Sequence, residues 1–204
     1  MEKKHKPLFI VISSPSGAGK TTLIKAILAD DKNFTLSISY TTRKKRLSEK
    51  NGKDYYFVEQ NAFDQMVDKG DFLEYVNTYD KSYGTSKYKT LDLTNLEKDI
   101  IFDIDWFGTK QLMENFTSDI ITIFILPPSL EELARRLKNR GTENEDSLKL
   151  RVENAKKEIS HANLYDYLIV NEDINEAITQ LKEIIAVERL KRINSDILIK
   201  NLIK

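Results

Sequence analysis

The chain has 204 residues, a length that suits one domain with a sizeable core. Lys and Arg together number 32, as do Asp and Glu, so the formal net charge is zero and a nucleic-acid partner has no global electrostatic support. The absence of cysteine excludes disulfides, thiolate metal sites and cysteine nucleophiles. No stretch approaches the roughly 18 apolar residues that span a membrane, so we expect a cytoplasmic protein that binds neither membrane nor nucleic acid.

Four short apolar runs predict buried strands, because they are continuous and rich in β-branched residues. They are Leu8–Ser13, Ile100–Phe102, Ile120–Leu126 and Tyr167–Val170. Helical apolar spacing begins after the first run, at Thr21–Asp30, and helical patterns also separate the later runs. Strands that alternate with helices form a parallel sheet with helices on both faces. The sequence therefore predicts an α/β fold of this kind.

Two segments interrupt this alternation. The first, 39–88, holds seven of the nine tyrosines and two turn signals, and we interpret it as an inserted lobe with short strands and a helix near Ala62–Lys69. The second, 129–165, is highly charged and helical. We divide the chain into core (1–38), inserted lobe (39–88), core (89–128), charged helical segment (129–165), and core with a terminal amphipathic helix from Ile174 (166–204).

A glycine-rich stretch, SPSGAGKTT at 14–22, follows the first predicted strand and opens the first predicted helix. Backbone N–H groups in such a loop bind phosphate oxygens, and Gly17 and Gly19 allow the close approach. Lys20 can reach the outer phosphates of a nucleotide. The spacing matches the P-loop pattern G-x-x-x-x-G-K-[ST] except at the first glycine; the alternative is a tight turn that happens to contain lysine. We predict that ATP is bound by Ser14, Pro15, Ser16, Gly17, Ala18, Gly19, Lys20, Thr21 and Thr22.

Two residues are candidates for holding Mg²⁺ beside this loop. The Thr21 hydroxyl can bind the ion directly. Asp103 ends the second predicted strand, and in P-loop proteins such an aspartate supports the metal and its waters. The alternative for Asp103 is a turn former or a helix cap.

Further segments stand in order along the chain: SISYTTRKKR, NGKDYYFV, DFLEYV, YGTS, DIDWFG, RLKNRG and YDYLIVN. Together with SPSGAGKTT, this set resembles guanylate kinase, a P-loop nucleoside monophosphate kinase, over one domain at about 7–189. The resemblance implies a P-loop core, an inserted α/β lobe that binds GMP, and a mobile helical lid at 129–165. It also implies the reaction of ATP and GMP to ADP and GDP with Mg²⁺, a step of purine metabolism and GMP recycling, with dGMP as a further acceptor.

The resemblance also implies an acceptor site in the inserted lobe. Arginine forks and phenol hydroxyls suit a phosphate dianion, and this role falls to Arg43, Arg46, Tyr55 and Tyr83. Guanine presents N–H donors side by side, which carboxylates accept; Glu74 and Asp105 match the acids that read them. Ser39 and Thr85 match hydroxyl positions that address the other guanine edge. The alternatives are a solvated basic turn or an RNA-binding patch for TTRKKR, an exposed charge for Glu74 and a turn cap for Asp105.

The resemblance also implies that arginines of the lid bind phosphate groups. Arg140 and Arg151 would move onto the transferring phosphoryl group and the ATP phosphates, with help from Arg136; Asn171 is a further ATP-binding residue. The alternative for these arginines is a surface salt-bridge face. The catalytic set implied is Lys20, Arg43, Arg140 and Arg151. No general base is needed, because the attacking GMP phosphate oxygen is already anionic.

Some residues depart from the family pattern, and other functions compete. Phe107 stands where the family usually has glutamine, and the turn after Arg46 is altered. A guanylate-kinase-like binding module without turnover is disfavoured because the P-loop lysine and the arginines are retained. A kinase for another phosphorylated acceptor, disfavoured by the two acids, would be found by an acceptor panel. The neutral net charge disfavours an RNA-binding protein. We expect a monomer or a homodimer.

Overall fold

A five-stranded sheet forms the centre of the fold. The computed structural model describes residues 6–78, 81–115, 120–139, 145–191, 199 and 202–203. All pairings in this sheet are parallel, and its strands lie in the order β2 (Phe34–Ser37), β7 (Asp99–Asp103), β1 (Phe9–Ser13), β8 (Ile120–Leu126) and β9 (Tyr167–Val170). The register sets Ile12 beside Asp103, so both strands end at the same edge. This edge carries the site described below.

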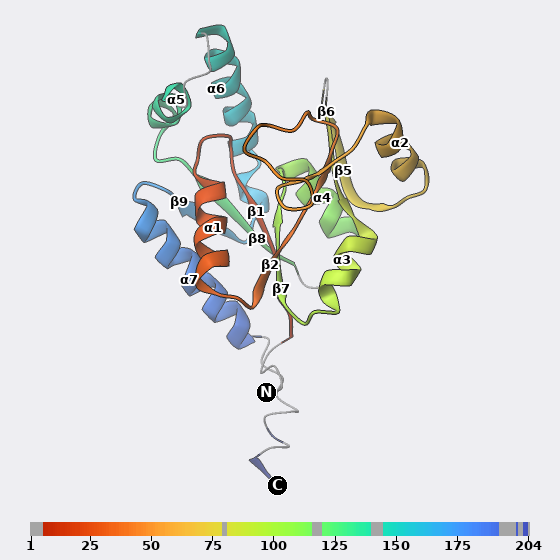
Figure 1. The fold of residues 1–204 in the computed structure, drawn as a ribbon. Helices are drawn as coiled ribbons and strands as arrows, with labels where there is room; N and C mark the ends of the chain where they lie inside the picture. Colours follow the sequence, from red (N-terminus) through yellow and green to blue (C-terminus); the bar gives the residue numbers. More distant parts are fainter. Residues whose placement is uncertain are drawn as a thin grey trace.

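Helices cover both faces of the central sheet (Figure 1). On one face, α1 (Lys20–Asp30) and α7 (Ile174–Lys191) pack their apolar residues into a core with the sheet side chains. On the other face, α3 (Lys87–Thr94), α4 (Trp106–Asn115) and the 3₁₀ turn η1 (Ala162–Leu164) contribute to a second core. Because both faces are buried, the strands are apolar without alternation. The predicted fold class is therefore confirmed.

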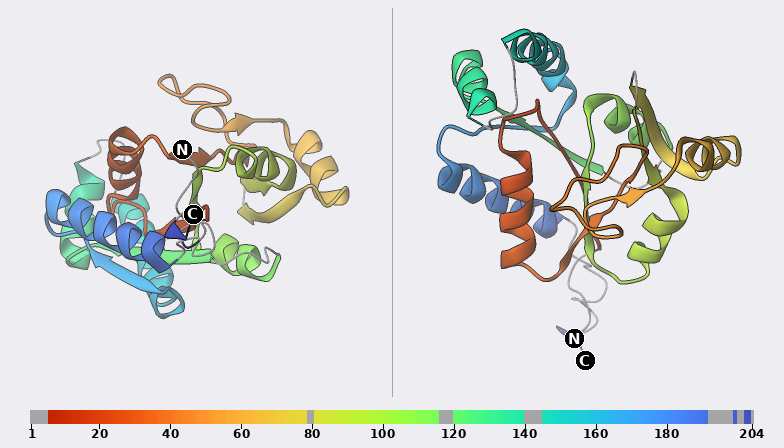
Figure 2. Two further views of the ribbon diagram at one scale, coloured as in Figure 1. Left: turned by 90° about the horizontal axis from the view of Figure 1, so that it is seen from below. Right: turned by 45° about the horizontal axis from the view of Figure 1, so that its top comes forward.

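A smaller mixed sheet stands beside the core. Its order is β4 (Tyr56–Phe57), β3 (Tyr40–Thr41), β6 (Lys81–Ser86) and β5 (Phe72–Thr78), with β5 and β6 antiparallel. Helix α2 (Gln60–Asp68) packs on it through Phe63, whose ring stacks on Phe72 at 4.6 Å. Figure 2 shows these elements to one side of the central sheet. We call this unit, 39–86, the acceptor lobe.

Two charged helices project from the end of the central sheet where β8 ends (Figure 1). They are α5 (Leu130–Lys138) and α6 (Glu145–Ile159). The Ser129 side chain caps α5 by accepting a hydrogen bond from the Glu132 N–H at 3.1 Å. Leu133, Leu137 and Ala155 are buried between the two helices and form a core separate from those of the sheet. The charged segment is thus an amphipathic helical pair with its own packing.

The predicted strands and helices agree with the structure except in detail. The four predicted strands are β1, β7, β8 and β9, with ends shifted by one residue at most. The helix predicted near Ala62–Lys69 is α2 and begins two residues earlier. Sequence reasoning missed β2, a four-residue strand that stands at the edge of the described sheet, beside β7. Within the described residues, no helix is both long and apolar enough to cross a membrane.

A buried ion pair connects α7 to β7 of the central sheet. The Asp99 side chain is fully buried at the start of β7 and accepts a hydrogen bond from the Leu8 N–H at 3.0 Å. Its other oxygen accepts two hydrogen bonds from Arg189 of α7, at 2.9 and 2.6 Å. Arg189 also pairs with Asp31 and lies over the Phe34 ring. Removing Arg189 would take the cation of this ion pair away from a buried carboxylate.

We predict that Arg189→Met lowers the free energy of unfolding by about 3 kcal/mol, because the buried Asp99 carboxylate loses its ion pair with Arg189. Urea unfolding monitored by circular dichroism measures the change. Lys182→Met is the matched control: it removes a cation from the same helix whose partner, Asp30, is largely exposed. That change should lower stability by less than about 1 kcal/mol. Equal effects of the two variants would contradict the role given to the buried pair.

Candidate active site

The glycine-rich stretch forms a loop between β1 and α1. Gly17 and Gly19 have positive φ values of 97° and 103°, which L side chains rarely adopt. An added Cβ on Gly19 would also collide with the Asn171 amide. Helix α1 begins at Lys20, directly after the loop, so the loop and the helix N-terminus together form an anion-binding arrangement. The loop geometry predicted from the sequence motif is present.

Asn171 joins the loop to the lid. Its buried side chain donates a hydrogen bond to the Ala18 carbonyl at 2.7 Å, and its backbone N–H donates to Leu126 at the end of β8. Its own carbonyl accepts a hydrogen bond from Arg136 of α5 at 3.1 Å. One residue therefore contacts the loop, the sheet edge and the last turn of α5.

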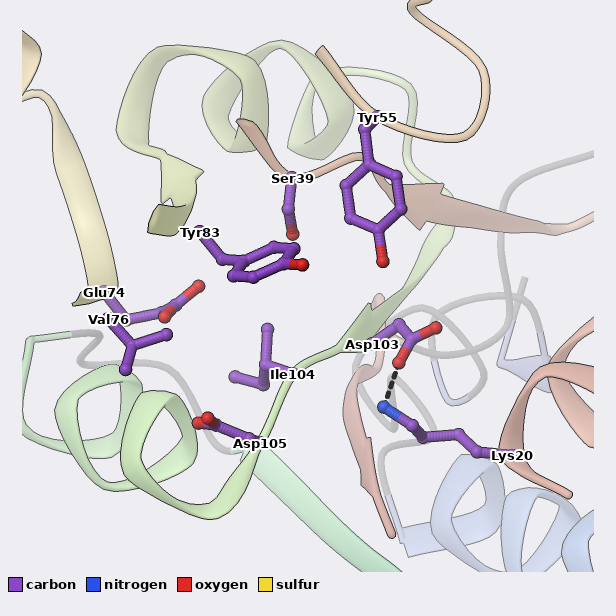
Figure 3. A pocket seen from close by; sticks show the side chains of 9 residues that line it. All are labelled: Lys20, Ser39, Tyr55, Glu74, Val76, Tyr83, Asp103, Ile104 and Asp105. Carbon is purple, nitrogen blue, oxygen red and sulfur yellow. Dashed lines mark hydrogen bonds and ion pairs between the residues drawn. The ribbon is translucent and has the colours of Figure 1, made fainter. Parts of the chain in front are cut away.

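A cavity of about 200 Å³ opens between the sheet edge and the acceptor lobe (Figure 3). Two carboxyl groups, Glu74 and Asp105, lie at one end of it, and Lys20 lies at the other end, ion-paired with Asp103. The Tyr55 and Tyr83 hydroxyls and Ser39 lie between these ends on the lobe side. The cavity is lined by Lys20, Ser39, Tyr55, Glu74, Val76, Tyr83, Asp103, Ile104 and Asp105. It thus brings together seven of the predicted site residues.

Glu74 is a buried acid on β5. Burial raises the pKa of its carboxyl to about 7, and the negative charge of Asp105 contributes in the same direction. The Thr85 hydroxyl donates a hydrogen bond to Glu74 and opposes this shift. A Cβ on Gly108 would lie 2.6 Å from Glu74 Oε2, so the glycine of DIDWFG makes room for the carboxyl. The site therefore holds an acid that is ready to exchange a proton near neutral pH.

Asp105 is fixed by the helix that follows it. Its Oδ1 accepts a hydrogen bond from the Gly108 N–H at 2.8 Å, which is the bond of an N-cap residue to α4. The carboxylate points into the cavity beside Glu74 (Figure 3). The turn-cap alternative and the proposed guanine contact are therefore compatible, because one oxygen serves the helix and the other is available to a ligand.

Arg43 lies next to the cavity without lining it. Its guanidinium pairs with both oxygens of Glu49, at 3.0 and 2.6 Å, and lies 5.3 Å from the centre of the Tyr55 ring. Burial raises the pKa of Tyr55 to about 12, so this hydroxyl keeps its hydrogen at neutral pH. The Arg46 side chain is exposed, and its backbone N–H donates to Glu49 at 2.8 Å. The two arginines of TTRKKR thus share Glu49.

A second cavity, of about 500 Å³, lies on the other side of the loop. Five of the residues that line it were predicted to bind ATP: Gly17, Gly19, Thr22, Arg136 and Asn171. Four others that line it were not predicted, and they include Asn139 and Asp173. On α6, Arg151 donates a hydrogen bond to the Ser16 hydroxyl at 2.8 Å, so a lid arginine contacts the loop. Arg140 lies outside the described residues.

A family model described as guanylate kinase matches residues 5–188. The chain belongs to the guanylate kinase family. A guanylate kinase of Rickettsia felis is 49% identical and covers 94% of this chain and 99% of that protein. A guanylate kinase of Zymomonas mobilis is 46% identical, covering 92% and 87%. The crystal structure of guanylate kinase from Anaplasma phagocytophilum aligns with a TM-score of 0.74 and 34% identity, covering 91% of this chain and 88% of that one.

Sequence reasoning missed two acids near the site. Glu49 occupies the arginine fork described above, and Glu158 lies in the last turn of α6. Burial raises the pKa of Glu158 to about 7, with Asp105 adding to the shift and Lys20 opposing it. Both acids belong to charged stretches that are typical of solvated surfaces, so no local signal marks them. Phe107, the departure from the family pattern, is partly exposed, contacts the Trp106 ring and is not among the cavity residues.

We predict that Glu74→Gln changes how stability depends on pH. A carboxyl whose pKa rises from 4.5 to about 7 on folding favours the folded chain at low pH and loses that contribution as the pH rises through this window. The unfolding free energy of the variant minus that of the wild type should therefore increase from pH 5 to pH 8, by at most about 3 kcal/mol, because only the wild type loses this contribution. Glu158→Gln should act in the same direction, because the pKa of Glu158 is also raised to about 7. A pH-independent difference for both variants would contradict the burial of these carboxyls.

Proposed function

We propose that this chain acts as a guanylate kinase, transferring the γ-phosphoryl group of ATP to GMP and releasing ADP and GDP. The observation that carries the proposal is the cavity of Figure 3, which has two acids at one end and the P-loop lysine at the other. A nucleoside monophosphate has matching ends: a base with hydrogen-bond donors and a phosphate dianion. In this orientation the acceptor phosphate faces the loop that binds ATP.

The acid end would recognise guanine. The base presents its N1–H and its exocyclic amino group side by side, and Glu74 and Asp105 can accept these hydrogens. Adenine has an acceptor at the corresponding ring nitrogen, which would face a carboxylate unfavourably. Ser39 and Thr85 are both buried beside the acids, and Ser39 is suited to donate to the remaining polar edge, whereas Thr85 would have to exchange its bond to Glu74 for that contact. A site that is built to hydrogen-bond its substrate rejects analogues that lack the matching groups by roughly 10⁴–10⁵-fold.

The phosphate of GMP would bind where the tyrosine hydroxyls and Arg43 meet. Tyr55 and Tyr83 direct their hydroxyls toward the middle of the cavity. The Arg43 guanidinium lies over the ring of Tyr55 in a cation–π contact. Guanidinium forks bind phosphate and carboxylate in the same bidentate geometry. Arg43 would therefore exchange Glu49 for the phosphate, with Arg46 close by on the same turn.

ATP would occupy the loop and the second cavity. Backbone N–H groups from Gly17 to Thr22 suit its phosphates, and Arg136 and Asn171 line the adjacent space. Arg151 contacts the loop through Ser16, and Arg140 is expected to join it on the transferred group. The Thr21 hydroxyl and the Asp103 carboxylate supply oxygen ligands of the kind that Mg²⁺ prefers, and the bound ion would neutralise charge on the ATP phosphates.

The chemistry is a displacement at phosphorus. An anionic oxygen of GMP forms a bond to the γ-phosphorus, and the bond from that phosphorus to the β–γ bridging oxygen breaks, leaving ADP. No proton has to be removed, so the protein's task is to align two anions and offset their charge. Lys20 lies beside the position where the two phosphates would meet, and its exchange of Asp103 for phosphate would deliver that charge. Closure of the lid and lobe would exclude water and prevent hydrolysis of ATP.

Several other expectations stay predictions. These are the use of dGMP as an acceptor, a cytoplasmic location, the absence of nucleic-acid and membrane partners, and the choice between monomer and homodimer. The apolar side chains of Val187 and Leu190 on α7 are exposed. Light scattering after size exclusion decides the oligomeric state.

An acceptor panel tests the proposed function. We predict rapid ADP formation from ATP and Mg²⁺ with GMP, slower formation with dGMP, and little with AMP, CMP or UMP. Lys20→Met should lower kcat by about 10²–10³-fold, because a preorganised positive charge is lost. Lys25→Met is the matched control, since Lys25 is exposed on the same helix, and it should retain activity. Turnover with another acceptor would overturn the guanine assignment, and folded protein that binds GMP without turnover would support the binding-module alternative.

We predict that Glu74→Ala mainly raises the KM for GMP and weakens the preference for GMP over AMP, because one hydrogen-bond acceptor for the base is lost. Steady-state kinetics at fixed saturating ATP measure both effects. The KM for ATP is the internal control and should stay within about twofold of the wild-type value, because Glu74 lies at the far end of the cavity from Lys20. Unchanged kinetics with GMP would reject Glu74 as a guanine-reading residue.

A further inference from the structure

Three buried hydroxyl groups meet behind the acid end of the cavity. They belong to Ser13 at the end of β1, Thr109 on α4 and Tyr165 after η1. Thr109 Oγ1 lies 3.1 Å from Ser13 Oγ and 3.0 Å from the Tyr165 hydroxyl oxygen. The three side chains are at most 8% exposed. Neither the P-loop nor the acceptor site described above uses this cluster.

Each hydroxyl has one hydrogen to donate, so three hydrogens serve four contacts, and when Ser13 and Thr109 both donate to carbonyls their two oxygens touch with no hydrogen between them. Ser13 donates to the Ile104 carbonyl at 2.7 Å, and Thr109 donates to the Asp105 carbonyl at 2.6 Å. Since the Thr109 hydrogen is used, Tyr165 must be the donor in its contact with Thr109. The cluster therefore directs hydrogens to two consecutive carbonyls, those of Ile104 and Asp105.

These carbonyls belong to the short connection between β7 and α4. Only Ile104 and Asp105 separate Asp103, the last residue of β7, from Trp106, the first of α4. The Asp105 carbonyl accepts from Thr109 twice, through the backbone N–H at 2.9 Å and through the hydroxyl. The Asp105 carboxylate is held from the other side by the Gly108 N–H. Thr109 thus limits the rotation of the residue whose carboxylate points into the cavity.

A second contact, besides that of Tyr165 with Thr109, joins the stretch 161–165 to α4. The Trp106 and His161 rings stack with centroids 3.8 Å apart. The stretch 161–165, which leads from the lid helix α6 to β9, therefore holds the start of α4 at two points, one aromatic and one hydrogen-bonded. This arrangement gives Tyr165 a fixed position from which to donate to Thr109.

We infer that Thr109, oriented by Tyr165, is a positioning residue that sets the Asp105 carboxylate for the acceptor base. This inference rests on the proposed function, since it assumes that Asp105 contacts guanine. Thr109 touches no substrate in this role. Its contribution is to hold the Asp105 backbone, so it should affect the acceptor and leave the donor nucleotide unaffected.

The test compares Thr109→Val, which keeps the shape and removes the hydroxyl, with Thr109→Ser, which keeps the hydroxyl. Thr109→Val should raise the KM for GMP by about five- to tenfold, the effect expected from losing one buried hydrogen bond at a binding residue. Its kcat and its KM for ATP should stay within about twofold of wild type. Thr109→Ser should restore the KM for GMP. Thr179→Val is the matched control, because Thr179 on α7 makes the same bond to the carbonyl four residues earlier.

A second variant keeps the test decisive if Thr109→Val does not fold. Tyr165→Phe removes the hydroxyl that donates to Thr109 and that also lies against Ser13, and it should raise the KM for GMP by about two- to threefold. An unchanged KM for GMP in both folded variants, or an equal rise in the KM values for GMP and ATP, would overturn the inference. Failure of the proposed function is seen separately: wild-type protein would then form no ADP with GMP, and the inference would fall with it.

Discussion

The site depends on the common polarity of the central strands. Because β1 and β7 are parallel and in register, their carboxyl ends reach the same edge, and the residues that follow them meet there. The P-loop follows β1, and Asp103 and Asp105 stand at the end of β7. Apolar side chains on both faces fix this register, so the core determines the distance between the loop and the acids. The acceptor lobe then covers one side of an edge that is already set.

Opposite charges are paired within the site. Lys20 pairs with Asp103, and Arg43 pairs with Glu49, so these two cations already have a carboxylate partner. Glu74 and Glu158 have raised pKa values because they are buried. Ligands that bring both a dianion and hydrogen-bond donors can satisfy the two groups together. This explains how a chain of zero net charge can hold a strongly charged pocket.

The parts that sequence reasoning could predict are those encoded locally. Continuous apolar runs predict the central strands, and a glycine–lysine spacing predicts the loop after β1. The edge strand β2 lacks such a signal, because it is short and only partly buried. The partners Glu49 and Glu158 and the hydroxyl of Thr109 were missed for a different reason. Their roles arise from contacts made in three dimensions, and each residue type is equally common on ordinary helices and turns.

The pairing of Arg43 with Glu49 would reduce the free energy gained when the proposed acceptor site binds a phosphate group. If Arg43 binds the phosphate as proposed, an incoming phosphate would have to displace a carboxylate that is already bidentate, so the exchange would yield less free energy than an encounter with an unpaired cation. A free phosphate ion gains little from that exchange. A nucleotide gains the base contacts at the other end of the cavity as well. In the proposed role of Arg43, the lobe would thereby favour a complete nucleotide over an inorganic phosphate ion.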